Sequence, residues 1–157
     1  MSYKLSIIIP TYNAENTILN AVNSIKNQSM DFKKIEIILV DDNSTDKTRE
    51  ILKKLSKDNS NIKCVFLDEN SGSPSKPRNE GINLSTTEYL MFLDNDDTYC
   101  ETMCEVMYSV AEKYNADMVS CRNYNIYDSD NKKTVFKSVL DKKEKIIKLN
   151  SIEEDTK

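Results

Sequence analysis

The sequence predicts a single α/β domain built on a central, mostly parallel sheet with helices on both faces. Short apolar runs of strand length alternate with segments of helical period, which is typical of βαβ units and right-handed crossovers. Several of these runs are continuously apolar, as expected for strands covered on both faces. The chain has 157 residues, enough for one domain with a substantial core.

Five apolar runs are expected to be strands. They are Leu5–Ile9, Ile35–Val40, Ile62–Leu67, Tyr89–Leu93 and Asp117–Cys121.

The segments between the strands are expected to be helices. They are Ala14–Gln28, a segment from a cap at Ser44 or Thr45 to about Lys57, Lys76–Leu84 and Glu101–Tyr114. In the first, apolar residues recur at i, i+3, i+4 and i+7, which forms one apolar stripe. In the second, early acidic and late basic residues suit the helix dipole. The expected apolar residues of the last are Met103, Val106, Met107 and Val110.

The pattern weakens after about residue 123. Asn125–Lys133 is rich in turn residues, Thr134–Leu140 has the composition of one more strand, and Asp141–Lys157 is highly charged. A charged segment with little apolar support is typical of a solvated helix or a frayed tail. We therefore expect a domain core over residues 1–125 and a polar extension over residues 126–157.

Bulk composition excludes several classes of function. The net charge of −4 and pI near 5.0 argue against a nucleic-acid partner, which a basic face would have to meet. No apolar window approaches the roughly 18–20 residues of a membrane span, and the start of the chain lacks a signal-peptide pattern. We therefore expect a cytoplasmic location.

The chain contains no histidine, which removes histidine general bases and histidine-containing zinc sites. A metal would be bound by oxygen, which indicates Mg²⁺ or Mn²⁺. The four cysteines form no CxxC pair, and only Cys100 and Cys104 would share a helix face. We expect reduced, mostly buried thiols.

Polar groups follow three of the expected strands. They are Pro10–Asn13, Asp41–Ser44 and Asp94–Asp97. Carboxylates crowded as in the third group repel one another unless a cation or substrate compensates, although an acidic turn before a helix would also explain them. In a parallel sheet these ends meet at one edge, where ligands bind.

Three other phosphate-handling folds fit poorly. Glycine-rich phosphate loops are excluded because Gly72 and Gly81 are the only glycines in the chain. A receiver domain would place the pair Asp41-Asp42 after the first strand, but a complete strand–helix unit precedes it here. Nucleotidyl transfer onto a sugar phosphate normally uses a basic, glycine-rich loop after the first strand, which is missing.

A nucleoside diphosphate suits the predicted edge. A carboxylate can accept the imide hydrogen of uracil, and a divalent cation can bridge another carboxylate to the diphosphate. Tyr12 could pack against the base, and Arg78 could approach the base or the diphosphate. Each residue alone has an ordinary structural explanation, and their combination favours a site.

Four motifs then occur in order. They are Ser6–Asn13, Val40–Asp46, Arg78–Ile82 and Leu93–Asp97. Together they resemble the family 2 glycosyltransferases over roughly residues 4–125. The resemblance implies the Rossmann-like GT-A fold and sugar transfer, usually with inversion, from a nucleotide diphosphate donor such as a UDP-sugar. The acceptor would be a saccharide or cell-surface polymer, as in bacterial polysaccharide biosynthesis.

The resemblance also implies site residues. The donor site would contain Pro10, Thr11, Tyr12, Asn13, Asp42, Gly72, Arg78, Asp94, Asn95 and Asp96. Asp42 would face uracil, and Arg78 would lie near the base and the diphosphate. Asp96 would hold Mg²⁺ or Mn²⁺ with Asp97 or Asp94, because both registers fit patterns used within the family.

The resemblance leaves the catalytic base unassigned. An inverting transfer needs a general base for the acceptor hydroxyl, and Asp128, Asp130 and Asp141 lie in polar segments where acidic residues are common. We expect the chain to be the donor-binding portion of a longer enzyme, with residues 126–157 starting the acceptor half. Membrane attachment through a further part would place it at the inner face of the membrane. The alternative is a non-catalytic nucleotide-sugar-binding module.

Overall fold

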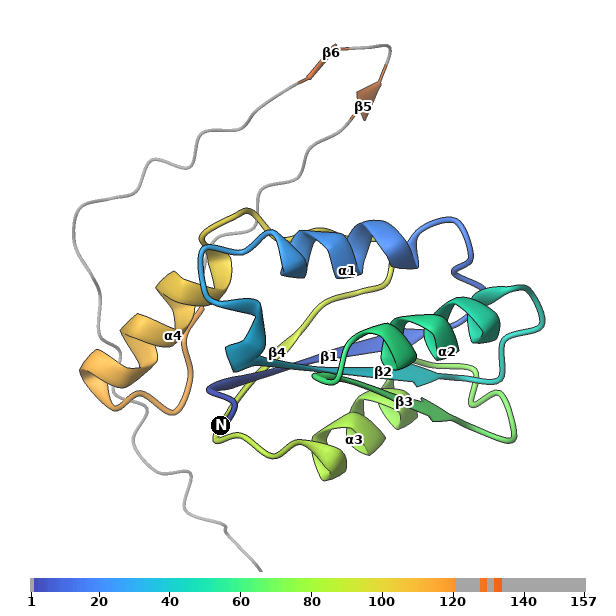
Figure 1. Cartoon of the computed structure of the whole chain (residues 1–157), viewed down its shortest axis with the longest axis horizontal. Helices are drawn as coiled ribbons and strands as arrows, with labels where there is room; N and C mark the ends of the chain where they lie inside the picture. Colours follow the sequence, from blue (N-terminus) through green and yellow to red (C-terminus); the bar gives the residue numbers. More distant parts are fainter. Residues whose placement is uncertain (1, 121–127, 130–131, 134–157) are drawn as a thin grey trace, which may run out of the picture. The chain divides into compact units, whose positions relative to one another are not determined.

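Four parallel strands form the central sheet of the computed structural model. They are β1 (Leu5–Thr11), β2 (Ile35–Asp41), β3 (Ile62–Phe66) and β4 (Tyr89–Phe92), in the spatial order β3-β2-β1-β4 (Figure 1). Every residue of β1 and β2 is buried, as their mainly apolar sequences predict for inner strands. The predicted α/β class, the parallel sheet and the first four strands are therefore confirmed.

The structure describes residues 2–120 and the backbone of residues 128–129 and 132–133. These fall into two units, one within residues 1–119 and one within residues 120–157. The second contains the short antiparallel pair β5 (Asp128–Ser129) and β6 (Lys132–Lys133). The strand expected at 134–140 and the charged segment after it lie outside the described residues, as do Asp130 and Asp141.

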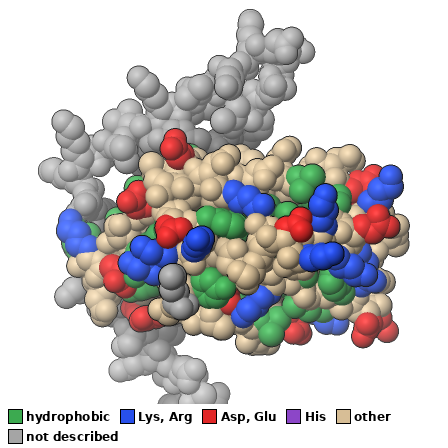
Figure 2. Space-filling model, in the orientation of Figure 1, with side chains coloured by type: hydrophobic (Ala, Val, Ile, Leu, Met, Phe, Trp, Pro, Cys, Tyr) green, Lys and Arg blue, Asp and Glu red, His purple; other side chains and the backbone are tan. Residues whose placement is uncertain are grey.

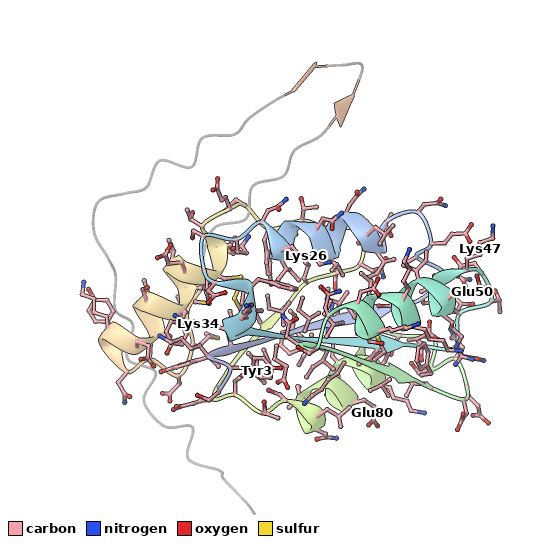
Figure 3. The ribbon with its side chains drawn as sticks, viewed as in Figure 1. Tyr3, Lys26, Lys34, Lys47, Glu50 and Glu80 are labelled. Carbon is pink, nitrogen blue, oxygen red and sulfur yellow. The ribbon has the colours of Figure 1, made fainter. Side chains whose placement is uncertain are left out.

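Helices cover both faces of the sheet (Figure 1). They are α1 (Ile18–Lys26), α2 (Thr48–Asp58), α3 (Ser75–Leu84) and α4 (Met103–Tyr114), with a short 3₁₀ helix, η1 (Phe32–Lys34), before β2. Buried residues of α1, α2 and α4 pack with Ile7 and Ile9 of β1, whereas α3 lies against Ile8 on the other face. Glu50 on α2 and Glu80 on α3 accordingly lie on opposite sides of the sheet (Figure 3).

Helix α3 approaches β1 closely at Gly81. A Cβ at this position would overlap Cγ2 of Ile8 and lie 3.1 Å from Cγ1 of the same side chain. Ile8 is fully buried in an inner strand and cannot move away easily. Glycine here lets α3 pack against the sheet and carry Arg78 to its carboxyl edge.

Two predicted elements differ in the structure. Residues 117–120 form no strand, and the side chain of Met118 is 72% exposed. A five-residue apolar run is a weak strand signal, and within the described residues β4 pairs with β1 alone. Helix α2 begins at Thr48, and neither Ser44 nor Thr45 caps it: the Ser44 hydroxyl accepts from the Asn13 N–H, and Asp46 Oδ1 accepts from the Thr48 N–H.

The predicted apolar side of α4 was only partly right: Met103, Met107 and Val110 are half-buried, but Val106 is exposed. Cys104 and Ala111 are its buried residues, whereas Val106 is 53% exposed. The helix begins two residues later than expected, and Cys104, a small apolar residue, meets the core. Cys100 is exposed, which corrects the expectation for that thiol, and the described cysteines are all free.

Basic and acidic side chains intermingle on the molecular face shown in Figure 2. Among the described residues, none of the helices has the length and apolar character needed to cross a membrane.

Candidate functional site

A cleft of about 380 Å³ opens at the carboxyl edge of the sheet. It is lined by residues at the end of β1 and just after it, by residues that follow β2 and β4, by the segment between β3 and α3, and by the first turn of α3. Of the ten residues predicted to bind the nucleotide sugar, all except Asn13 line it. The topology thus brings together side chains that are more than eighty positions apart in the sequence, such as Pro10 and Asn95.

The chain after β1 forms one wall of this cleft. The Pro10 carbonyl accepts a hydrogen bond from Asn95 Nδ2 at 3.2 Å, which ties the end of β1 to the loop after β4. The Thr11 hydroxyl donates to its own strand, at the Ile9 carbonyl, while Tyr12 lines the cleft and is 47% exposed. Tyr12 is therefore available to pack against a planar ligand.

Asn13 turns away from the cleft and joins two loops. Its φ angle of 47° is in the left-handed region, which asparagine tolerates better than most residues. Its N–H donates to Ser44 Oγ, and its Oδ1 accepts from the Thr45 N–H, both at 2.9 Å. Asn13 thereby fixes the loop after β1 to the loop after β2.

The same loop pair is held by Asp46. Its carboxylate accepts hydrogen bonds from the Thr48 N–H at 2.9 Å and the Glu15 N–H at 3.1 Å. Partial burial by itself would raise the pKa of Asp46, but these bonds outweigh it and hold the pKa below its ordinary value. Asp46 is therefore ionised at neutral pH and stabilises the loop that follows Asp42.

The adjacent residues Asp41 and Asp42 have different surroundings. Asp41 is fully buried, and its Oδ2 accepts from Arg49 Nε at 2.7 Å. Asp42 is 4% exposed and lines the cleft. Both Asp42 oxygens lie 3.0 Å from the Ser71 N–H, and Oδ2 also accepts from the Ser71 hydroxyl at 2.9 Å. Asp41 thus anchors the strand end, and Asp42 faces the ligand space.

Helix α3 and the loop after β4 add opposite charges to the cleft: Arg78 comes from α3, and Asp94 and Asp96 come from the loop. Arg78 Nη2 donates to Asp94 Oδ1 at 2.6 Å, while Arg78 Nε is buried and has no partner among the described residues. Asp96 also lines the cleft, and its carboxylate has no hydrogen bond or ion pair within residues 2–120. An unpartnered guanidinium N–H and an unpaired carboxylate in one cleft suit a ligand that carries phosphate and binds a metal.

The metal assignment stays a prediction. Among the described residues, no three acidic or cysteine side chains are grouped so as to hold a metal ion. Asp94 is engaged by Arg78, and Asp97 does not line the cleft. Mg²⁺ is commonly held by one or two carboxylates together with substrate phosphates, so Asp96 with one neighbouring aspartate fits this chemistry.

The sequence interpretation missed four residues that line the cleft. They are Asn70, Ser73, Pro74 and Pro77, all from the segment that precedes Arg78. Asn70 donates to the Asp42 carbonyl at 3.0 Å and accepts from the Gly72 N–H at 2.7 Å. The two prolines and Gly72 were the available sequence signals of a shaped loop, and Gly72 has a φ angle of 70° in the structure.

Comparison with known proteins gives a consistent result. The model of the family described as "Glycosyl transferase family 2" matches residues 6–155. A poly(ribitol-phosphate) beta-glucosyltransferase of Bacillus spizizenii is 43% identical over 94 residues, which are 60% of this chain and 15% of that protein. Glycosyltransferase GlyG of Streptococcus pneumoniae is 35% identical over 130 residues, 83% of this chain and 42% of that protein. The chain therefore spans less than half the length of these relatives.

A solved structure of a glycosyltransferase is also similar to this chain. Staphylococcus aureus TarS 1–349 in complex with UDP has a TM-score of 0.67 and 34% identity to this chain, over 71% of this chain and 33% of that one. The same TarS fragment has also been solved with UDP-GlcNAc.

Proposed function

The chain belongs to the family 2 glycosyltransferases, and from this premise we propose that it binds the sugar-nucleotide donor of an enzyme that transfers a sugar from a UDP-sugar to a saccharide or cell-surface polymer. One observation carries the proposal: Asp42, Arg78 and Asp96, from three separate segments, line one cleft at the carboxyl edge of a parallel sheet. The TarS complexes with UDP and UDP-GlcNAc support the choice of donor. The names of the relatives support a polymer of the bacterial cell wall as the acceptor.

The nucleoside would lie between Tyr12 and Asp42. The Asp42 carboxylate would accept the N3–H of uracil, and the exposed Tyr12 ring would pack against the base. Thr11 and Gly72 also line the cleft.

The diphosphate would lie near Arg78. Its buried, unpartnered Nε could donate to a phosphate oxygen while Nη2 keeps its bond to Asp94. Asp96, with Asp94 or Asp97, would hold Mg²⁺ or Mn²⁺. Such an ion, when bound, neutralises charge on a departing diphosphate.

The acceptor side of the reaction needs residues beyond those that line the cleft. An inverting transfer requires a general base, and the described residues place no acidic side chain in the cleft beyond Asp42, Asp94 and Asp96. We propose that the base and the acceptor groove lie in a further part of the protein. Residues 126–157 would begin that part, and the whole enzyme would act in the cytoplasm at the inner face of the membrane.

Ligand-dependent thermal melting tests the proposal. The chain is melted with UDP, GDP, CDP or ADP, each with and without Mn²⁺. UDP with Mn²⁺ at one hundred times its dissociation constant should stabilise the fold by about 2.7 kcal/mol. Asp42→Ala and Asp96→Ala should lose most of this stabilisation, whereas Asp58→Ala, an exposed aspartate at the end of α2, should keep it.

Two results would contradict parts of the proposal. Absence of any shift with UDP and Mn²⁺ would remove the donor assignment. A full shift in Asp96→Ala would remove the metal assignment alone. Donor binding by a full-length protein that transfers no sugar to any polymer would instead favour a non-catalytic nucleotide-sugar-binding module.

A further inference from the structure

Ser71 holds the Asp42 carboxylate in one orientation. The Ser71 N–H lies 3.0 Å from both Asp42 oxygens, and the Ser71 hydroxyl lies 2.9 Å from Oδ2. Twenty-eight residues separate Ser71 from Asp42 in the sequence, so the loop before α3 was brought to the end of β2 by the fold. Such a frame fixes the plane of the carboxylate as well as its position.

The surrounding loop is arranged to keep Ser71 in place. Asn70 Nδ2 donates to the Asp42 carbonyl at 3.0 Å, and Asn70 Oδ1 accepts from the Gly72 N–H at 2.7 Å. Gly72 has a φ angle of 70°, which allows the chain to turn back after Ser71. The loop therefore contacts Asp42 through both its backbone and its side chain.

The Ser71 hydroxyl has one hydrogen and two acceptors within reach. These are Asp42 Oδ2 and the Ser73 carbonyl, both at 2.9 Å. A charged acceptor forms the stronger bond, so the hydrogen is directed to Asp42. An ionised carboxylate offers about four acceptor positions, and Ser71 occupies about two of them. The carboxylate keeps capacity for one donor from a ligand.

We propose that Ser71 is a positioning residue that sets the base selectivity of the donor site, by holding Asp42 as an oriented acceptor for a ring N–H. The inference rests on the proposed function, in which Asp42 faces the base. Uracil presents a donor at N3, whereas cytosine presents an acceptor there and would be repelled by a fixed carboxylate. A carboxylate free to rotate would discriminate less, because it could turn away or be bridged by water.

The test compares UDP with N3-methyl-UDP, in which a methyl group replaces the hydrogen of the ring donor. Dissociation constants are measured by calorimetry for the wild-type chain, Ser71→Ala, Ser71→Thr and the control Ser75→Ala. Ser75 is exposed four residues further on and does not line the cleft. Wild type and Ser75→Ala should prefer UDP by about tenfold or more, as expected for a hydrogen bond to a charged group.

Ser71→Ala should reduce this preference to about threefold or less, with the affinity for N3-methyl-UDP unchanged within about twofold, because one of the bonds that orient the carboxylate is lost. Ser71→Thr, which keeps the hydroxyl, should restore the preference. The discrimination against CDP should fall and recover in parallel. If Ser71→Ala does not fold, Ser71→Cys serves instead, because its thiol is a weak donor.

The outcomes distinguish a failure of the inference about Ser71 from a failure of the proposed role of Asp42. A full preference for UDP in Ser71→Ala would overturn the inference. Equal weakening of both ligands would also overturn it, since Ser71 would then only support the loop. Failure of the wild-type chain to prefer UDP over N3-methyl-UDP would instead contradict the proposed role of Asp42 itself.

Discussion

The replacement Arg49→Met should remove the cation that compensates the buried Asp41 carboxylate. Asp41 is fully buried, and its Oδ2 accepts from Arg49 Nε at 2.7 Å and from the Ser44 N–H at 3.2 Å. Asp41 Oδ1 has no hydrogen-bond partner among the described residues, so Arg49 supplies most of its stabilisation. Arg49 Nη2 also donates to the Leu67 carbonyl at 2.7 Å.

The expected loss of stability follows from this geometry. Removing one partner of a buried ion pair costs about 3–5 kcal/mol, because the other charge stays buried. The Arg49 side chain is 35% exposed, which lets water reach the site after the replacement. We therefore expect about 3 kcal/mol, near the lower end of that range. This is a large part of the roughly 5–15 kcal/mol that stabilises a typical domain.

Urea denaturation of four chains measures the effect: wild type, Arg49→Met, Asp41→Asn and the double variant. The double variant should be more stable than the sum of the single losses predicts, by about 1–3 kcal/mol, because it leaves no unpaired charge. Lys54→Met, on the exposed side of α2, should change stability by no more than about 0.5 kcal/mol. A loss below about 1 kcal/mol in Arg49→Met, or strictly additive losses, would refute the reasoning.

Three further predictions concern packing, pH and thiol reactivity. Gly81→Ala should cost about 1–3 kcal/mol through overpacking against Ile8, offset by about 1 kcal/mol from the higher helix propensity of alanine. The loss caused by Gly81→Ala should be smaller in an Ile8→Ala background, where the clashing side chain is gone. Calorimetric losses that are additive in the double variant would argue against the close contact. Burial alone would raise the pKa of Glu36, but the hydrogen bonds to its carboxylate lower the pKa below 4.5. Glu36 therefore stabilises the fold above that pH, and this stabilisation is lost as the pH falls through the lowered pKa. Glu36→Gln should therefore flatten the acid limb of the stability–pH curve, and an unchanged limb would contradict this. Burial raises the pKa of Cys104 to about 12, whereas Cys100 is exposed. Peptide mapping after iodoacetamide treatment at pH 8 should therefore find Cys100 labelled and Cys104 protected. Labelling of both cysteines would show that α4 opens.

The sequence was sufficient for the architecture because the relevant signals are local. Continuous apolar runs mark strands buried on both faces, and the stripe formed by Ile18, Ala21, Val22 and Ile25 marks the buried face of α1, where all four residues are fully buried. Polar residues directly after β1, β2 and β4 then had to meet at one edge, since parallel strands end together. The positions of Tyr12, Asp42 and Asp96 in one cleft were predictable for this reason.

Local sequence signals predicted the boundaries of elements, and short elements such as the strand expected at 117–121, less well. Ser44 could have capped a helix, but the fold engages its hydroxyl with the Asn13 N–H, thirty-one positions away. Residues 117–120 have the composition of a strand but form no strand in the structure. In α4, Val106 is exposed, and Cys104 is the residue that packs in the core. In each case a tertiary partner decided between two locally acceptable arrangements.

The sequence by itself therefore determined the family, the four strands of the main sheet and most of the side chains at its carboxyl edge. Only the tertiary structure decided what each side chain does there. It paired Asp41 with Arg49, left Asp42 to face the cleft, and brought Ser71 against Asp42 from a distant loop. The physical reason is that strand and helix patterns arise from neighbours along the chain, whereas the orientation of a carboxylate depends on donors that only folding brings within 3 Å.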